Sequence, residues 1–138
     1  MTKTRRPAGA DLDSRAVAIE CARICDDFKA EDIVVLDVEH LLGLTDFFVI
    51  ATGQNVRNLR GIAEELKNRM AVHGLVTRND NPTGKSGWAL LDFGLLVVHL
   101  FEKNVREFYD LEFLWADAER VAWAEGADAP ETGSAGEE

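Results

Sequence analysis

The sequence lacks any apolar run approaching the roughly 18 to 20 residues that a helix needs to span a bilayer. Its first residues, MTKTRRPAGAD, have no hydrophobic segment of a signal peptide behind the arginines. Both features predict a cytosolic protein that does not insert into a membrane.

Cysteine is also scarce, with only Cys21 and Cys25 in the chain. A metal site would need further ligands at suitable spacing, and the histidines, His40, His73 and His99, lie in unrelated segments. The two cysteines stand four apart in a helical pattern, so they share one helix face. We interpret them as buried thiols and predict no metal.

Positive charge is the third deficit, since 15 Lys and Arg oppose 25 Asp and Glu and give a net charge of -10. Residues 117–138 contain seven of the acids and one arginine, which leaves 18 acids and 14 bases in the rest. An acidic chain is repelled by phosphate backbones, so broad nucleic-acid binding is a poor hypothesis. A basic protein partner suits this charge better.

The sequence also has no clustered catalytic carboxylates. A magnesium-dependent transferase needs two or three acids converging on one strand edge. Asp37, Asp46 and Asp92 are the only acids in the expected strands, and each is alone in its segment. No Ser or Cys stands in a recognisable nucleophile motif. We therefore predict no enzyme activity and no cofactor.

Two short motifs resemble phosphate-binding loops. TGKS at 83–86 ends like a nucleotide loop, but Asn79 replaces the required glycine and an expected strand follows instead of a helix. TGQN at 52–55 stands at the start of a helix, where free amides attract anions, although any strand-to-helix turn has this geometry. Weak nucleotide binding at TGQN is the alternative function.

Apolar spacing predicts one α/β domain with a mixed sheet and helices packed on it. We expect a helix from about Ser14, capped by Asp13 or Ser14, strands at 33–38 and 46–51 covered on both faces, and a helix at 56–73 between Asn55 and Gly74. A hairpin and one or two short helices follow up to Trp115. We assign 1–13 to a disordered tail, 14–116 to the domain, and 117–138 to an acidic, mostly disordered tail in which 117–125 extends a helix.

The hairpin carries the most information. With Phe93 and Gly94 as its two-residue turn, Trp88, Asp92 and His99 share one face with aliphatic residues. The other face is purely apolar and contains Ala89, Leu91, Leu96, Val98 and Leu100. We expect the mixed face to be the more open one and to contact a protein partner, because indole is a large, rigid anchor. The alternative is that Trp88 is half-buried with His99 as its neighbour.

The segment after the hairpin has apolar residues at near-helical spacing. We expect Tyr109, Leu111 and Leu114 to pack a short helix back on the sheet, with Asp110 as a possible cap.

Five stretches, in this order, resemble the ribosomal silencing factors, also called Iojap or RsfS proteins. They are KAEDIVVLDV (29–38), LTDFFVIATG (44–53), NVRNLRGIAEEL (55–66), GWALLDFGLLVVHLF (87–101) and REFYDLEFLW (106–115). The resemblance implies a nucleotidyltransferase-like fold without catalytic carboxylates. It also implies binding to the large ribosomal subunit through ribosomal protein L-fourteen, which blocks joining of the small subunit and lowers translation when nutrients are short. Members are often homodimers when free.

The contact surface that this resemblance implies falls on Trp88, Asp92 and Phe93, with neighbouring acids and the segment after His99, and Phe93 would reach the partner from the turn. Together with His99 from the mixed face, Trp88, Asp92 and Phe93 are the predicted partner-binding residues. Three positions depart from the usual family pattern, namely Asn58, Lys85 and Leu95. A plain dimerisation module is the remaining alternative.

Overall fold

The computed structural model describes residues 13–78 and 87–124 of the chain. The two expected disordered tails lie outside these residues apart from Asp13 and 117–124, and TGKS at 83–86 lies wholly outside them. Within the described chain, no helix is long and apolar enough to cross a bilayer.

A five-stranded mixed sheet forms the middle layer, in the order β3-β4-β2-β1-β5. Its central pair, β2 and β4, is parallel, and the other neighbours are antiparallel. The strands are β1 (Glu31–Asp37), β2 (Phe47–Thr52), β3 (Trp88–Asp92), β4 (Leu96–Phe101) and β5 (Glu119–Arg120). Every residue of β2 is buried, which confirms the expectation that both of its faces are covered.

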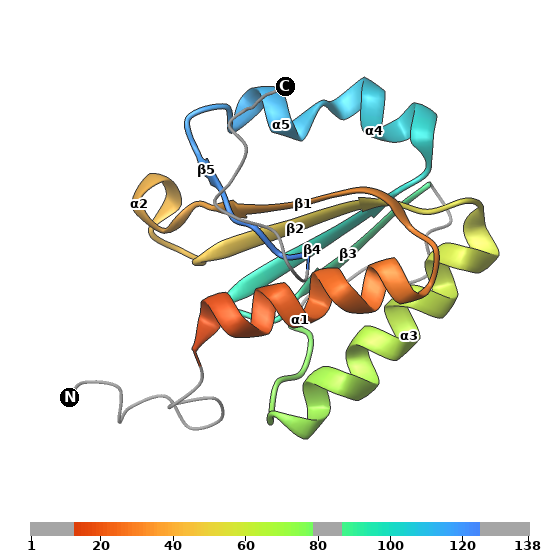
Figure 1. The fold of residues 1–138 in the computed structure, drawn as a ribbon, viewed down its shortest axis with the longest axis horizontal. Helices are drawn as coiled ribbons and strands as arrows, with labels where there is room; N and C mark the ends of the chain where they lie inside the picture. The colour runs from red at the N-terminus through yellow and green to blue at the C-terminus, as the bar shows by residue number, and fades with distance from the viewer. Residues whose placement is uncertain (1–12, 79–86, 125–138) are drawn as a thin grey trace.

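Helices α1 (Ser14–Asp27) and α3 (Val56–Val72) cover one face of the sheet (Figure 1). Asp13 caps α1 by accepting the Arg15 N–H at 3.1 Å, and Asn55 caps α3 by accepting the Asn58 N–H at 2.8 Å. These contacts confirm both expected helix starts. Gly74, with a φ of 80°, follows the end of α3 in the left-handed region.

The inward stripe of α1 contains both cysteines, which are fully buried and free, as expected. Burial raises the pKa of the Cys25 thiol to about 12, and the pKa of the Cys21 thiol is also raised by burial. Neither thiol is therefore ionised near neutral pH.

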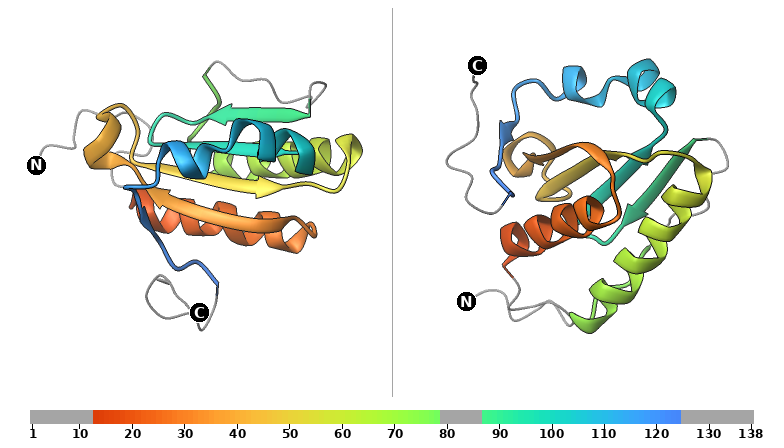
Figure 2. Two further views of the ribbon diagram at one scale, coloured as in Figure 1. Left: turned by 90° about the horizontal axis from the view of Figure 1, so that it is seen from above. Right: turned by 45° about the vertical axis from the view of Figure 1, so that its right-hand side comes forward.

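The opposite face of the sheet is covered by α4 (Lys103–Tyr109) and α5 (Leu111–Leu114), so the domain has three layers (Figures 1 and 2). Under these helices lies a second apolar cluster formed by Val34, Leu36, Val38, Phe48, Ile50 and Phe101. Leu111 and Trp115 pack against this cluster. The two short helices thus close the core on this side.

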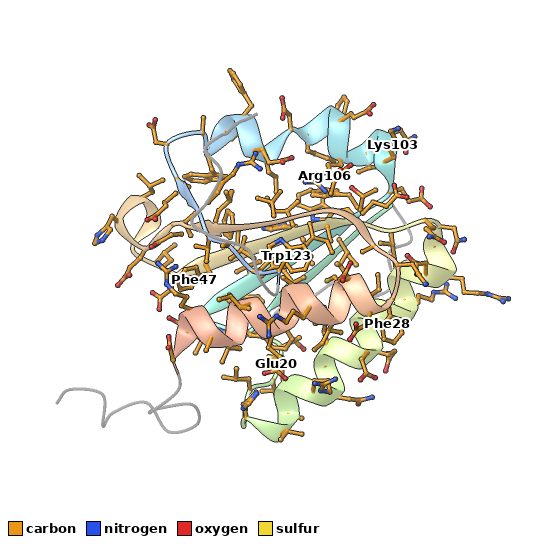
Figure 3. All side chains as sticks on the ribbon, in the orientation of Figure 1. Glu20, Phe28, Phe47, Lys103, Arg106 and Trp123 are labelled. Carbon is orange, nitrogen blue, oxygen red and sulfur yellow. The ribbon has the colours of Figure 1, made fainter. Side chains whose placement is uncertain are left out.

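The chain after Trp115 differs from the expectation. The described part of the expected extension, residues 117–124, does not extend a helix, because Glu119–Arg120 form β5 and pair with the end of β1. Val121 is buried, and the Trp123 indole N–H donates to the Ile33 carbonyl at 3.1 Å (Figure 3 labels Trp123). The two apolar side chains of this stretch stand two residues apart, which suits an extended chain. A short helix, α2 (Glu39–Leu42), was also not expected.

Candidate partner-binding surface

The hairpin turn lies one residue later than the sequence suggested. Asp92 pairs with Val97 and Trp88 with Phe101, while the Phe93 N–H donates to the Leu96 carbonyl at 2.9 Å. Gly94 is therefore the first central residue of the turn, with a φ of 91°, and its N–H donates to Asp92 Oδ1 at 2.9 Å. The expected turn was wrong because it would have given Phe93 the positive φ that glycine adopts without strain.

The shift changes each strand partner by two residues, so the two faces of the hairpin keep their predicted members. Its apolar face is confirmed, because all five predicted residues are buried between the sheet and the helices α1 and α3. The mixed face is the more open of the two, as expected, because Trp88 and Asp92 on it are partly exposed. It is not exposed over its whole length, however. Phe101 also lies on that face and is 0% exposed, because α4 and α5 fold back over it.

The four predicted partner-binding residues do not form one exposed surface. Trp88 and Asp92 are partly exposed, but His99 is only 6% exposed. Phe93 was expected to project from the turn. Instead it is 4% exposed and packs in the core that α1 and α3 cover. Their role in binding a partner stays a prediction, and the burial of His99 and Phe93 leaves Trp88 and Asp92 as the accessible pair.

Trp88 lies in an aromatic cluster that joins the hairpin to α4. Its indole N–H donates to His99 Nδ1 at 3.3 Å, and its ring centroid is 4.6 Å from that of Tyr109. His99 also contacts the edge of Phe48, with ring centroids 4.9 Å apart. Trp88 is thus half-buried with His99 as its neighbour, and its remaining surface continues into Tyr109.

Burial lowers the pKa of His99 to about 4, so the imidazole is neutral at physiological pH. Because Nδ1 accepts the indole N–H, the proton of the neutral ring belongs on Nε2. Nε2 is buried and has no hydrogen-bond partner among the described residues. His99 therefore orients the Trp88 indole from the buried side of that ring. It is not placed to act as a proton carrier.

Among the described residues, the exposed aromatic side chains lie on α4 and α5. We define the aromatic patch as Phe108, Tyr109, Phe113 and Leu114, which are 80%, 43%, 75% and 65% exposed. Leu111 packs on the sheet as expected, but the expectation for Leu114 was wrong, and Tyr109 is only half covered. The rings of Phe108 and Tyr109 are in contact, with centroids 5.1 Å apart. Large exposed apolar side chains that gather on one segment are typical of interaction sites.

Sequence reasoning missed Phe108 and Phe113. The available signal was the number of large apolar residues between 105 and 115, which exceeds what one face of two short helices can bury. Val105, Leu111 and Trp115 take the inward positions, so the remaining apolar residues are left outside.

The start of α3 offers little to a phosphate. Asn55 already accepts the Asn58 N–H, and Asn58 Oδ1 accepts the Gln54 N–H at 2.9 Å. The Gly53 N–H donates to the Phe101 carbonyl at 2.8 Å. The amides of Gly53 and Gln54 in TGQN are therefore engaged within the protein, and Asn58 has a structural role of its own.

Carboxylates are not gathered at a catalytic position in the described part of the chain. β1 begins earlier than expected and includes Glu31 and Asp32, whereas Asp46 precedes β2, so the expected set of strand acids was incomplete. Even so, no three His, Cys, Asp or Glu side chains among the described residues are placed to hold a metal ion.

Comparison with known proteins gives a consistent result. A family model described as "Ribosomal silencing factor during starvation" matches residues 11–138. The ribosomal silencing factor RsfS of Bacillus subtilis is 35% identical over 107 residues, which cover 78% of this chain and 91% of that protein. The chloroplastic protein Iojap of Arabidopsis thaliana is 37% identical over 112 residues, covering 80% of this chain and 46% of that protein.

Solved structures agree with this similarity. A crystal structure of a Chromobacterium violaceum protein superposes with a TM-score of 0.71 at 27% identity, covering 76% of this chain and 88% of that one. A Bacillus halodurans structure gives a TM-score of 0.64 at 32% identity, with coverage of 75% and 95%.

Proposed function

The chain belongs to the ribosomal silencing factors, a family of non-enzymatic ribosome-binding proteins, and we propose that it represses translation by occluding a face of the large subunit. The proposed target is ribosomal protein L-fourteen on the surface that meets the small subunit. Binding there prevents subunit joining by steric exclusion, so no chemical step is needed.

The aromatic patch is the observation that carries this proposal. Phe108 and Phe113 are mostly exposed, and the patch continues through Tyr109 to Trp88. Aromatic side chains supply much of the binding energy at protein interfaces, because they bury a large area at a small cost in conformational entropy. The proposed contact surface therefore consists of the aromatic patch, Trp88 and Asp92.

Charge favours a protein target over ribosomal RNA. The net charge of -10 opposes the approach of a phosphate backbone, whereas it attracts a basic ribosomal protein. Within α4, Glu107 is exposed beside the patch, and Asp110 is exposed between the two helices. An interface on the order of 1,600 Å² in total would give a stable complex.

The test is co-sedimentation of the full chain with purified large subunits, followed by addition of small subunits. We expect the chain to pellet with large subunits and to reduce the amount of joined ribosomes. Phe113→Ser and Trp88→Ala should weaken pelleting by about tenfold or more, since central aromatic anchors commonly contribute over 1.4 kcal/mol.

The matched control is Val72→Ser, because Val72 is 81% exposed at the end of α3, on the opposite side of the sheet (Figure 1). This variant removes a comparable exposed apolar group and should bind like the unmodified chain. Equal losses for Val72→Ser and Phe113→Ser would contradict the proposed surface. Self-association of the free chain, which the family resemblance implies, can be measured in the same samples without ribosomes.

A further inference from the structure

The two helices that carry the aromatic patch are too short to hold their own geometry. α4 has seven residues and α5 has four, and neither has a side-chain cap at its N-terminus. Between them Asp110 adopts a φ of 51°, in the left-handed region that a residue other than glycine rarely occupies. Helices of this length are unstable alone in water, so tertiary contacts must fix the angle between them.

Arg106 supplies such contacts from the inner side of α4. It is 8% exposed, and Figure 3 shows it between the helix and the sheet. Its Nη1 donates to Thr52 Oγ1 of β2 at 2.8 Å. Its Nε and Nη2 each lie 3.1 Å from a different carboxylate oxygen of Glu112 on α5. One side chain therefore connects both helices to each other and to the sheet.

Glu112 extends this connection to the last strand. Its Oε2 lies 3.6 Å from Arg120 Nη2 on β5. Arg120 is 53% exposed in its side chain, so that contact is screened by solvent. The Arg106–Glu112 pair is less exposed than this contact, with side chains 9% and 27% exposed, and its forked geometry sets both distance and orientation.

We propose that Arg106 is a positioning residue for ribosome binding, which sets the relative orientation of α4 and α5 and so brings the two halves of the aromatic patch into one surface. The proposal rests on the proposed function. Arg106 does not touch the partner, because its side chain points toward the sheet and away from the patch. It acts through Glu112 and Thr52.

The chemistry of the contacts makes arginine specific here. Three nitrogen atoms of one planar guanidinium contact two residues in different elements, Glu112 of α5 through both carboxylate oxygens and Thr52 of β2 through its hydroxyl. A lysine ammonium keeps the charge but is a single point and cannot reproduce the fork. Arg106→Lys therefore keeps the positive charge at this position but removes the forked contacts that orient α4 and α5.

The experiment combines large-subunit pelleting with hydrogen exchange of the full chain. Arg106→Lys, Glu112→Gln and Thr52→Val each weaken one part of the network, and Asn104→Gln is the control because Asn104 is an exposed, uncharged residue of α4. The amide that reports on α5 is that of Trp115, the residue after its end, which donates to the Leu111 carbonyl at 2.9 Å. Amides of β4 report on the core.

We expect Arg106→Lys to weaken pelleting by about tenfold and to speed exchange of the Trp115 amide by a similar factor, as loss of one charged hydrogen-bond pair would. Exchange in β4 should change much less, so the chain stays folded while it loses affinity. Glu112→Gln should give a smaller effect in the same direction, and Thr52→Val the smallest. Asn104→Gln should leave both measurements unchanged.

Different failures remain distinguishable. If Arg106→Lys speeds exchange in α5 but binds like the unmodified chain, the orientation of α5 does not matter for binding and the proposal is overturned. If it changes neither measurement, the network does not hold α5 and the proposal is again overturned. If the unmodified chain does not pellet, or Phe113→Ser pellets equally well, the proposed function or surface fails instead.

Discussion

The buried imidazole of His99 predicts a pH dependence of stability that can be measured on the isolated chain. In the folded protein, burial lowers the His99 pKa to about 4, whereas an unfolded histidine has a pKa of about 6.5. The unfolded state therefore binds more protons between these two values. The His99 contribution is fully present above about pH 6.5 and is lost as pH falls toward 4.

The difference between the two pKa values corresponds to roughly 3.4 kcal/mol when the loss is complete. Between about pH 7.5 and pH 5 the expected loss is about 2 kcal/mol, since the unfolded histidine is then almost fully protonated and the folded one is not. A loss of this size is a large part of the stability of a small domain. Its physical origin is the unpaired Nε2 and the surrounding rings of Phe48, Trp88 and Phe101.

Urea unfolding at the two pH values measures this loss, with His99→Asn as the comparison. An asparagine oxygen can still accept the Trp88 indole N–H but does not titrate in this range. His40 and His73 are present in both proteins, so their contributions cancel in the difference. The unmodified chain should lose about 2 kcal/mol more than the variant on acidification. Equal losses in both proteins would refute the assignment of His99 as a neutral, buried group.

Two further predictions concern the packing of the hairpin and of the last strand. Gly87→Ala should destabilise the fold by about 2 kcal/mol, because Gly87 has a φ of 81° and an added Cβ would lie 2.7 Å from Val105 Cγ2. Gly43→Ala is its control, since a similar φ of 74° there meets open space, and an equal cost in urea unfolding would argue against the steric contact. Trp123→Phe removes the hydrogen bond to the Ile33 carbonyl and should cost about 1 kcal/mol, with faster amide exchange confined to β5 and its neighbour. Unchanged exchange in β5 would show that Trp123 does not hold this strand.

Regular elements could be predicted from the sequence because their signals are local. The apolar stripe of α1 and the caps at Asp13 and Asn55 define their helices through contacts within four residues. The predicted turn of the hairpin was displaced by one residue, because Gly94 belongs both to the expected turn, Phe93–Gly94, and to the observed turn, Gly94–Leu95. Only the requirement that the residue with positive φ come first selects the observed one.

Long-range burial could not be predicted in the same way. The strand period showed which face of the hairpin is the more open one, but not that α4 and α5 cover part of it. In the sheet, this face continues into Phe48, Ile50 and Leu36 of the neighbouring strands, and this larger apolar surface requires a cover. Likewise, β5 has only two residues, and such a short strand has no periodicity that could reveal it.

The segment 103–115 closes the core and, in the proposed function, also binds the partner, and these two roles fall on different side chains. Val105, Leu111 and Trp115 point inward and close the core, whereas Phe108 and Phe113 point outward and are mostly exposed. Because the outward residues contribute little to the core, selection for stability alone would favour polar residues at these positions. The proposed function gives a reason for their apolar character, namely contact with a partner. Stability and ribosome binding should consequently be separable by substitution within this one segment, with loss of both from inward changes and loss of binding alone from outward ones.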